Sequence, residues 1–230
     1  MEKVSAPQPD LTAETQRLFG NKTRGKILKT SLLLFNESGF DRVSTARLAE
    51  AAEVLDGTLW YHFKAKQDLV IAHLDALETR LENHLAAEII DNPNCMAKHF
   101  FGMFDILWEF RYLLRDPLQA LQEGEMLARL QLTYRAIESR AEERLLRVER
   151  LGLIDLSETD VKALVTSCFI VGRHWLDYVR IREAGQVDLD HSRRQGMIQL
   201  LTLIRPYFTE QAQALFAGLD VLTLIREQNG

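Results

Sequence analysis

The sequence predicts an all-α protein, and three observations favour that fold class. Apolar residues recur at helical spacing along most of the chain, in segments longer than ordinary strands. Residues typical of helix ends flank these segments: Ser44 and Ser157 precede them, and Gly39 and Gly152 follow them. No segment shows the alternation of apolar and polar residues that is typical of a strand.

The first helix is expected from Thr23 to Gly39. Within it, Ile27, Leu28, Leu32 and Phe35 recur on a helical period. Residues 1–21 before it are expected to be a flexible tail, with room for a short helix over "LTAETQRLF".

Two short helices and a long one should follow. Ser44 caps a helix over "TARLAEAA", the three residues "EVL" break it, and the next short helix covers "GTLWYHF". Two short helices at this spacing fit a helix-turn-helix at about residues 44–63. A linking helix is then predicted from Lys66 to about Glu88.

The rest of the chain also has helical spacing. The residues "RDP" interrupt an aromatic helical segment, and Gly152 ends a charged helical segment. The residues "SETD" mark the start of the next helix. A short terminal helix or pair is expected after Pro206. The predicted helices in this part cover residues 95–114, 118–151, 158–182 and 190–205.

Composition indicates a folded protein. Apolar residues make up 47% of the 230 residues and only five residues are proline, which argues against a largely disordered chain. The longest apolar run, 163–172, is too short to span a membrane. Cys95 and Cys168 lie far apart in apolar surroundings, and no secretory segment opens the sequence. We expect a cytoplasmic protein with reduced cysteines and no membrane partner.

Charge is divided unevenly along the chain. The net charge is −5, yet residues 20–70 hold eight Lys or Arg against six Asp or Glu. That segment therefore carries +2, and residues 71–230 carry −6. A basic head on an acidic body suggests an anionic partner for the head alone, although ordinary solvated charges would give the same small excess.

The segment "DGTLWYHFKAKQDL" has the residue types of a DNA reader. Four consecutive aromatic residues cannot all face the core of one helix, so some must be exposed. Leu59 and Phe63 are expected to pack beneath the helix. Thr58, Tyr61 and His62 could then reach phosphates, and Lys66 could hold another at the start of the next helix.

The stretch "ILKTSLLLFNESGFDRVSTARLAEAAEVLDGTLWYHFKAKQDLV" resembles the DNA-binding head of the TetR family of bacterial repressors, over about residues 22–81. The resemblance implies a three-helix head that contacts DNA. The chain departs from the family where Glu53 replaces glycine, Leu55 replaces a capping residue and Trp60 replaces tyrosine. The candidate DNA contacts are Ser44, Thr45, Arg47, Asp56, Gly57, Thr58, Trp60, Tyr61, His62 and Lys66.

The same resemblance implies that residues 82–230 form a larger helical domain that dimerises and binds an effector. Aromatic residues with a few polar groups suit a small, largely apolar effector, although such residues are more often ordinary core. The candidate effector contacts are Phe100, Phe104, Trp108, Phe110, Met126, Tyr134, Cys168 and His174. The candidate dimer contacts, which could instead be core, are Gly172, Met197, Leu200, Leu201 and Ile204.

We therefore expect a ligand-responsive transcriptional regulator, most simply a repressor that binds a palindromic operator as a homodimer and leaves it when a small molecule binds. The sequence has no enzyme motif, no metal-ligand spacing and no sign of a cofactor. Two alternatives stay open. The chain could be an all-helical carrier or enzyme, or a DNA-bound scaffold whose body binds a protein.

Overall fold

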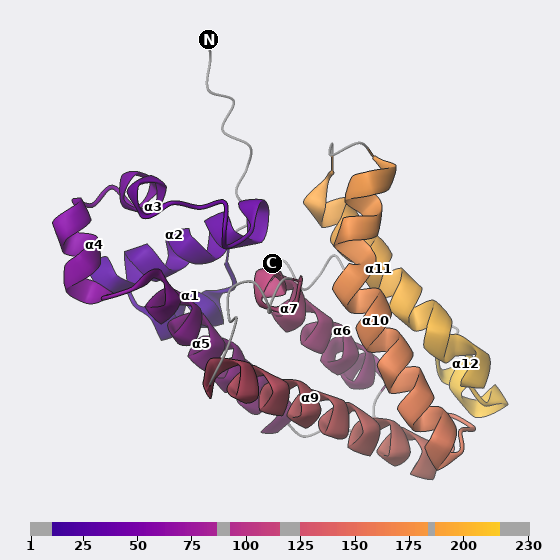
Figure 1. Ribbon diagram of the computed structural model, residues 1–230. Helices are drawn as coiled ribbons and strands as arrows, with labels where there is room; N and C mark the ends of the chain where they lie inside the picture. Colours follow the sequence, from indigo (N-terminus) through magenta and orange to yellow (C-terminus); the bar gives the residue numbers. More distant parts are fainter. Residues whose placement is uncertain (1–10, 87–92, 116–124, 184–186, 217–230) are drawn as a thin grey trace. The chain divides into compact units, whose positions relative to one another are not determined.

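The computed structural model is helical, which confirms the predicted fold class (Figure 1). It describes residues 11–86, 93–115, 125–183 and 187–216. The elements are α1 (Ala13–Phe19), α2 (Thr23–Ser38), α3 (Thr45–Ala51), α4 (Asp56–His62), α5 (Lys66–Ala86), α6 (Pro93–Glu109), α7 (Arg111–Arg115), α9 (Glu125–Arg150), α10 (Glu158–Arg182), α11 (Leu189–Ile204), η1 (Arg205–Tyr207) and α12 (Glu210–Phe216).

The chain divides into two compact units, which we describe separately. Unit 1 comprises Met1–Glu82 and Ile106–Gln131, and unit 2 comprises Asn83–Asp105 and Leu132–Gly230. The boundaries fall within α5, α6 and α9. Residues 106–131, which the sequence assigned to the body, thus belong to the same compact unit as the head.

In unit 1, the predicted apolar faces of α2 and α5 form the core. Leu28, Leu32 and Phe35 of α2 are at most 1% exposed, and so are Leu74 and Leu77 of α5. The helix ends follow the predicted signals, since α2 ends before Gly39 and the Ser44 hydroxyl accepts a hydrogen bond from Arg47 N at 3.2 Å.

A buried polar network joins α1 to the rest of unit 1. Arg80 on α5 lies 2.8 Å from Glu109 at the end of α6, and both residues are at most 7% exposed. The Thr15 hydroxyl of α1 donates to Glu109 at 2.9 Å and accepts from Arg80 at 2.6 Å. Thr12, the N-cap of α1, donates its backbone N–H to Glu109 at 2.8 Å. A buried ion pair needs such additional partners, and α1 supplies them.

A buried histidine makes a second connection within unit 1. The Nδ1 atom of His73 lies 2.7 Å from the Tyr112 hydroxyl of α7, and Nε2 lies 3.0 Å from the Leu28 carbonyl of α2. Burial lowers the pKa of His73 to about 3, against the opposing effect of the hydrogen bond to Leu28. The imidazole is therefore neutral near pH 7.

In unit 2, α10 and α11 pack closely against one another. Trp175 of α10 donates its indole N–H to the Ser192 carbonyl of α11 at 2.7 Å. A Cβ atom at Gly196 would lie 2.8 Å from Trp175 and 3.0 Å from Phe104. Glycine is therefore needed at this position for the helices to approach so closely.

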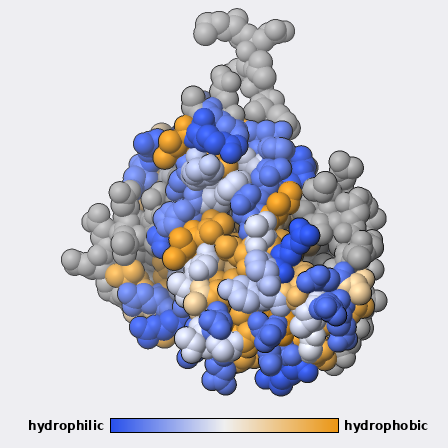
Figure 2. Space-filling model, turned by 90° about the vertical axis from the view of Figure 1, so that its right-hand side faces the viewer, coloured by the Kyte–Doolittle hydropathy of each residue, from blue (hydrophilic) through white to orange (hydrophobic). Residues whose placement is uncertain are grey.

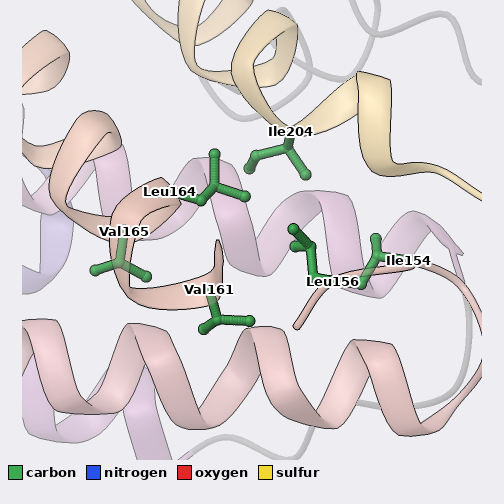
Figure 3. Close-up of a cluster of buried hydrophobic side chains, with 6 residues drawn as sticks. All are labelled: Ile154, Leu156, Val161, Leu164, Val165 and Ile204. Carbon is green, nitrogen blue, oxygen red and sulfur yellow. The ribbon is translucent and has the colours of Figure 1, made fainter. Parts of the chain in front are cut away.

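A cluster of buried aliphatic residues fills the core beside these helices (Figure 3). Ile204 comes from α11, and Ile154 and Leu156 come from the segment that precedes α10. An isolated antiparallel bridge between Ile154 and Phe208 holds that segment in place. The cluster therefore joins parts of the chain that are about fifty residues apart in sequence.

Figure 2 shows patches of hydrophobic residues, in orange, among hydrophilic ones on one face of the molecule. On α10, Ile170, Tyr178 and Ile181 are 57%, 54% and 85% exposed. Among the described helices, none is both long enough and apolar enough to cross a membrane.

Candidate DNA interface

The helices α3 and α4 form the predicted helix-turn-helix, at the left of Figure 1. Between them the chain turns at Glu53, whose φ of 50° lies in the left-handed region. The family usually has glycine at this position. Glu53 therefore adopts a backbone conformation that favours glycine. The turn is retained without it, and Glu53 pairs with Lys26 of α2 at 2.5 Å.

The inner faces of both helices are anchored as expected. Leu48 and Ala49 of α3 and Leu59 of α4 are at most 3% exposed, and so is Phe63, which ends α4. The prediction that Leu59 and Phe63 pack beneath α4, the reader helix, is confirmed. This packing supports a helix of seven residues, which would be too short to persist alone.

The outer face of α4 carries the aromatic residues. Tyr61 is 76% exposed and Trp60 is 41% exposed, whereas Thr58 and His62 are half-buried. The Tyr61 and His62 rings contact each other edge to face, with centroids 5.2 Å apart. Thr45 is also half-buried. The exposed candidates besides Trp60 and Tyr61 are Ser44, Arg47, Asp56 and Gly57.

Lys66 is partly buried, and its ammonium has partners inside the head. It donates to the Phe40 carbonyl and lies 3.9 Å from the centroid of the Phe40 ring. Burial lowers the pKa of Lys66, although Asp41 acts in the opposite direction. Lys66 therefore holds the start of α5 to Phe40, which follows α2, and a phosphate contact would be a second role.

The acidic residues near the reader helix have local roles. Asp56 lies in the first turn of α4, where the helix dipole favours a negative charge. Asp68 accepts hydrogen bonds from the backbone N–H groups of Lys64 and Ala65, at 2.7 and 3.0 Å, and so orders the turn before α5. These contacts explain why carboxylates are found beside a surface proposed to face a polyanion.

Family models match most of the chain. One described as "Bacterial regulatory proteins, tetR family" matches residues 27–73, and one described as "Bacterial transcriptional repressor" matches residues 73–216. The chain belongs to the TetR family. The resemblance seen in the sequence is thereby confirmed.

Individual TetR-family relatives match smaller parts of the chain. The HTH-type transcriptional regulator TtgR of Pseudomonas putida is 33% identical over 91 residues, which are 37% of this chain and 43% of TtgR. The regulator QacR of Staphylococcus aureus is 25% identical over 96 residues, 41% of this chain and 51% of QacR. The chain thus spans about half the length of these relatives.

Solved TetR-family structures match along almost the whole chain. A TetR-family transcriptional regulator from Marinobacter aquaeolei VT8 is 26% identical, with a TM-score of 0.70, over 90% of this chain and 98% of that one. CprB from Streptomyces coelicolor, solved with its operator sequence, has a TM-score of 0.67 over 89% and 97% of the two chains. At 19% identity, CprB shows a common fold.

In this TetR-family chain the candidate effector contacts do not lie in a single unit. Phe104, Tyr134, Cys168 and His174 belong to unit 2 with Phe100, whereas Trp108 and Phe110 belong to unit 1. The side chain of Met126 lies outside the described residues.

Within unit 2, the candidates differ in environment. Phe100 and Cys168 pack against the aliphatic cluster, and the ring of Tyr134 contacts that of Phe169, with centroids 6.4 Å apart. Burial raises the pKa of the Cys168 thiol to about 11, so it is protonated near pH 7. His174 is exposed.

The candidate dimer contacts also divide into two groups. Met197, Leu200 and Ile204 are at most 7% exposed within one chain, so they have little surface left for a second copy. Leu201 and Gly172 are partly exposed, and a Cβ atom at Gly172 would meet nothing within 4 Å. Within unit 2 it is Gly196, and not Gly172, that lies where two helices approach closely, and this spacing cannot be read from local sequence.

Among the residues that the structure describes, no three His, Cys, Asp or Glu side chains come together as metal ligands would. Two basic side chains of unit 2, His99 and Arg144, each have a buried nitrogen atom without a hydrogen-bond partner in the described part of the chain, and no sequence motif indicated them.

Proposed function

We propose that the protein is a ligand-responsive transcriptional regulator, most simply a repressor, that reads an operator with α3 and α4. The observation that carries this proposal is the division of α4 into two faces. Tyr61 and Trp60 are exposed on a helix that Leu59 and Phe63 fasten from beneath. An exposed aromatic and polar face on a short, well-anchored helix is suited to contact bases and phosphates in a major groove.

Two copies of the chain are needed to read a palindrome, because one short helix makes too few contacts for useful affinity. We place the dimer face on α10 and α11, with the partly exposed Leu201 and Gly172 at or near it. A functional division into a head of residues 22–81 and a body of residues 82–230 is part of this proposal. As a regulator of DNA it would act in the cytoplasm, and we assign it no catalytic step.

A small effector bound in the body would release the operator. It can do so only if it binds one arrangement of the two heads more tightly than another. Phe100, Phe104 and Tyr134 are the aromatic residues of unit 2 that we propose for contact with the apolar part of such a ligand.

The proposal is tested by selecting bound fragments from genomic DNA and measuring affinity for them at several salt concentrations. Because the head neutralises phosphates, log K should fall steeply with log salt, with a slope of at least about −4 for a dimer. Tyr61→Ala should weaken binding to the selected fragment at least about tenfold. Leu132→Ala, which truncates an exposed side chain on α9, is the matched control and should bind normally.

Binding without salt dependence, or an equal effect of both substitutions, would contradict the proposed reader face. Failure to select any fragment would favour a carrier. Tight, specific binding that no small molecule releases would favour the scaffold alternative.

A further inference from the structure

Two histidines of unit 2 are stacked where the end of α5 meets α6. The rings of His84 and His99 are 3.9 Å apart and inclined by 18°. The Nε2 atom of His84 lies 2.8 Å from the His99 carbonyl and donates to it. A Cβ atom at Gly102 would lie 2.7 Å from the His84 ring, so glycine makes room for this ring on α6. His99 is therefore held by His84 through both its ring and its carbonyl.

Arg144 of α9 reaches the same place. One of its terminal nitrogens, Nη2, donates to the Leu85 carbonyl at 2.9 Å, which fixes the plane of the guanidinium. Its other terminal nitrogen, Nη1, is buried and has no hydrogen-bond partner among the described residues. The Nε2 atom of His99 is also buried and also lacks a partner in the described part of the chain. Within the described part of the chain, these two nitrogen atoms are thus withdrawn from water and have no hydrogen-bond partner.

Among the described residues, the charges that act on these two side chains are mostly positive. Burial, followed by the charges of His84 and Arg144, lowers the pKa of His99 to about 3. Burial also lowers the pKa of Arg144, followed by the charges of Arg147 and Arg140. The acid that acts in the opposite direction is Glu143, which is exposed and pairs with Arg140 at 3.0 Å.

An unpaired buried cation destabilises a protein, and so does a buried donor without an acceptor. Both costs are removed if an anion lies between the two nitrogen atoms. A carboxylate suits them because it has two oxygens, one for Arg144 Nη1 and one for an Nε2–H of neutral His99. A neutral ligand would leave the arginine uncompensated.

We infer that Arg144 and His99 form the binding site for the carboxylate of the effector. This inference rests on the proposed function as a ligand-responsive regulator and adds the chemical class of the ligand. Neither residue is among the aromatic candidates that the sequence indicated.

The apolar part of the ligand is specified by the neighbours of the two residues. Phe100 follows His99 in the chain, and Ala141 and Leu145 lie on α9 beside Arg144. All three pack against the aliphatic cluster of unit 2, as does Phe169. A ligand with its charged end at Arg144 would have aliphatic and aromatic surface within reach. The expected effector is therefore a monocarboxylic acid with an apolar chain or ring.

The test compares acids with their uncharged amides. Octanoate, decanoate and 4-phenylbutyrate, each paired with its primary amide, are titrated calorimetrically into the full chain without DNA. At least one acid should bind about tenfold or more tightly than its amide, as expected for hydrogen bonds to charged groups. Arg144→Gln should reduce this preference to below about threefold. Arg140→Gln removes the same charge from the exposed surface one turn earlier and should leave the preference unchanged.

Three results would overturn the inference: equal binding of acid and amide, no binding of any of the three acids, or an unchanged preference in Arg144→Gln. A second measurement separates binding from a structural role. If Arg144 serves a ligand, Arg144→Gln should leave the Tm of the unliganded protein unchanged or raised, and a clear fall in Tm would assign it to the core instead. Because the titration contains no DNA, it can succeed or fail independently of operator binding.

Discussion

The two lysines that follow the reader helix have different surroundings. Lys66 is held by the Phe40 carbonyl and lies over the Phe40 ring. Lys64 is exposed, and its ammonium lies 3.3 Å from the Trp60 carbonyl. An exposed ammonium can turn to a phosphate at little cost, whereas a partly buried one would first have to leave its partners. The two residues should therefore contribute differently to folding and to DNA binding.

Lys66→Ala should lower the Tm by roughly 2–6 °C, because a cation–π contact and a hydrogen bond are lost. Lys64→Ala should leave the Tm unchanged and make the salt slope of DNA binding about one unit less steep, because one phosphate contact is lost. Differential scanning calorimetry and binding at graded salt concentrations measure the two effects. The distinction would be wrong if Lys66→Ala melted like the wild type and changed only the slope.

At this scale, sequence reasoning predicted what depends on local spacing. It identified the buried positions of Leu59 and Phe63, because side chains four apart share one face of a helix. It did not predict that Lys66 would contact Phe40, since these residues are 26 positions apart. Nor could it show whether Glu53 has a positive φ, although the usual glycine of the family was the available signal.

At the scale of the elements, α1 also shows that local features could be predicted and long-range contacts could not. Its existence was allowed for by the sequence, but its attachment to unit 1 was not predicted. The contacts that attach it join Thr12 and Thr15 to Glu109, across 94 or more residues. Helix ends, in contrast, were predicted well where a cap decides them, as at Ser44 and at Ser157, whose side chain accepts from Asp160 N. Capping is a local interaction, and docking is not.

The attachment of α1 can be measured by removing one hydroxyl. Thr15→Val preserves shape but leaves Arg80 and Glu109 each without one partner, so the free energy of unfolding should fall by about 1–3 kcal/mol. Thr79→Val, on α5, removes only a hydroxyl bonded to the Asp75 carbonyl in its own helix and should cost less than about 0.5 kcal/mol. Urea titration of both variants gives the comparison. Equal losses would mean that the network does not hold α1.

At the scale of the whole molecule, the sequence could not decide which face of an apolar helix turns inward. It offered Met197, Leu200 and Ile204 as contacts between copies or, alternatively, as core, and these residues are buried within one chain. Such residues look alike in sequence whether the neighbouring helix belongs to the same chain or to another. Solvent exposure within one chain distinguishes the two cases, and in α10 and α11 the exposed large apolar residues lie on the outer face of α10.

Ile170, Tyr178 and Ile181 lie on one face of α10 at helical spacing and are each more than half exposed. In a dimer built on α10 and α11, this face would be buried, so Ile170→Glu would place a charge in an apolar interface. We expect Ile170→Glu to sediment as a folded monomer and to lose operator affinity at least about a hundredfold, because a monomer reads only one half-site. Leu132→Glu makes the same change at an exposed leucine of α9 and should remain dimeric and bind normally. Circular dichroism verifies that both variants are folded. An unaltered dimer for Ile170→Glu would place the interface on another surface of the protein.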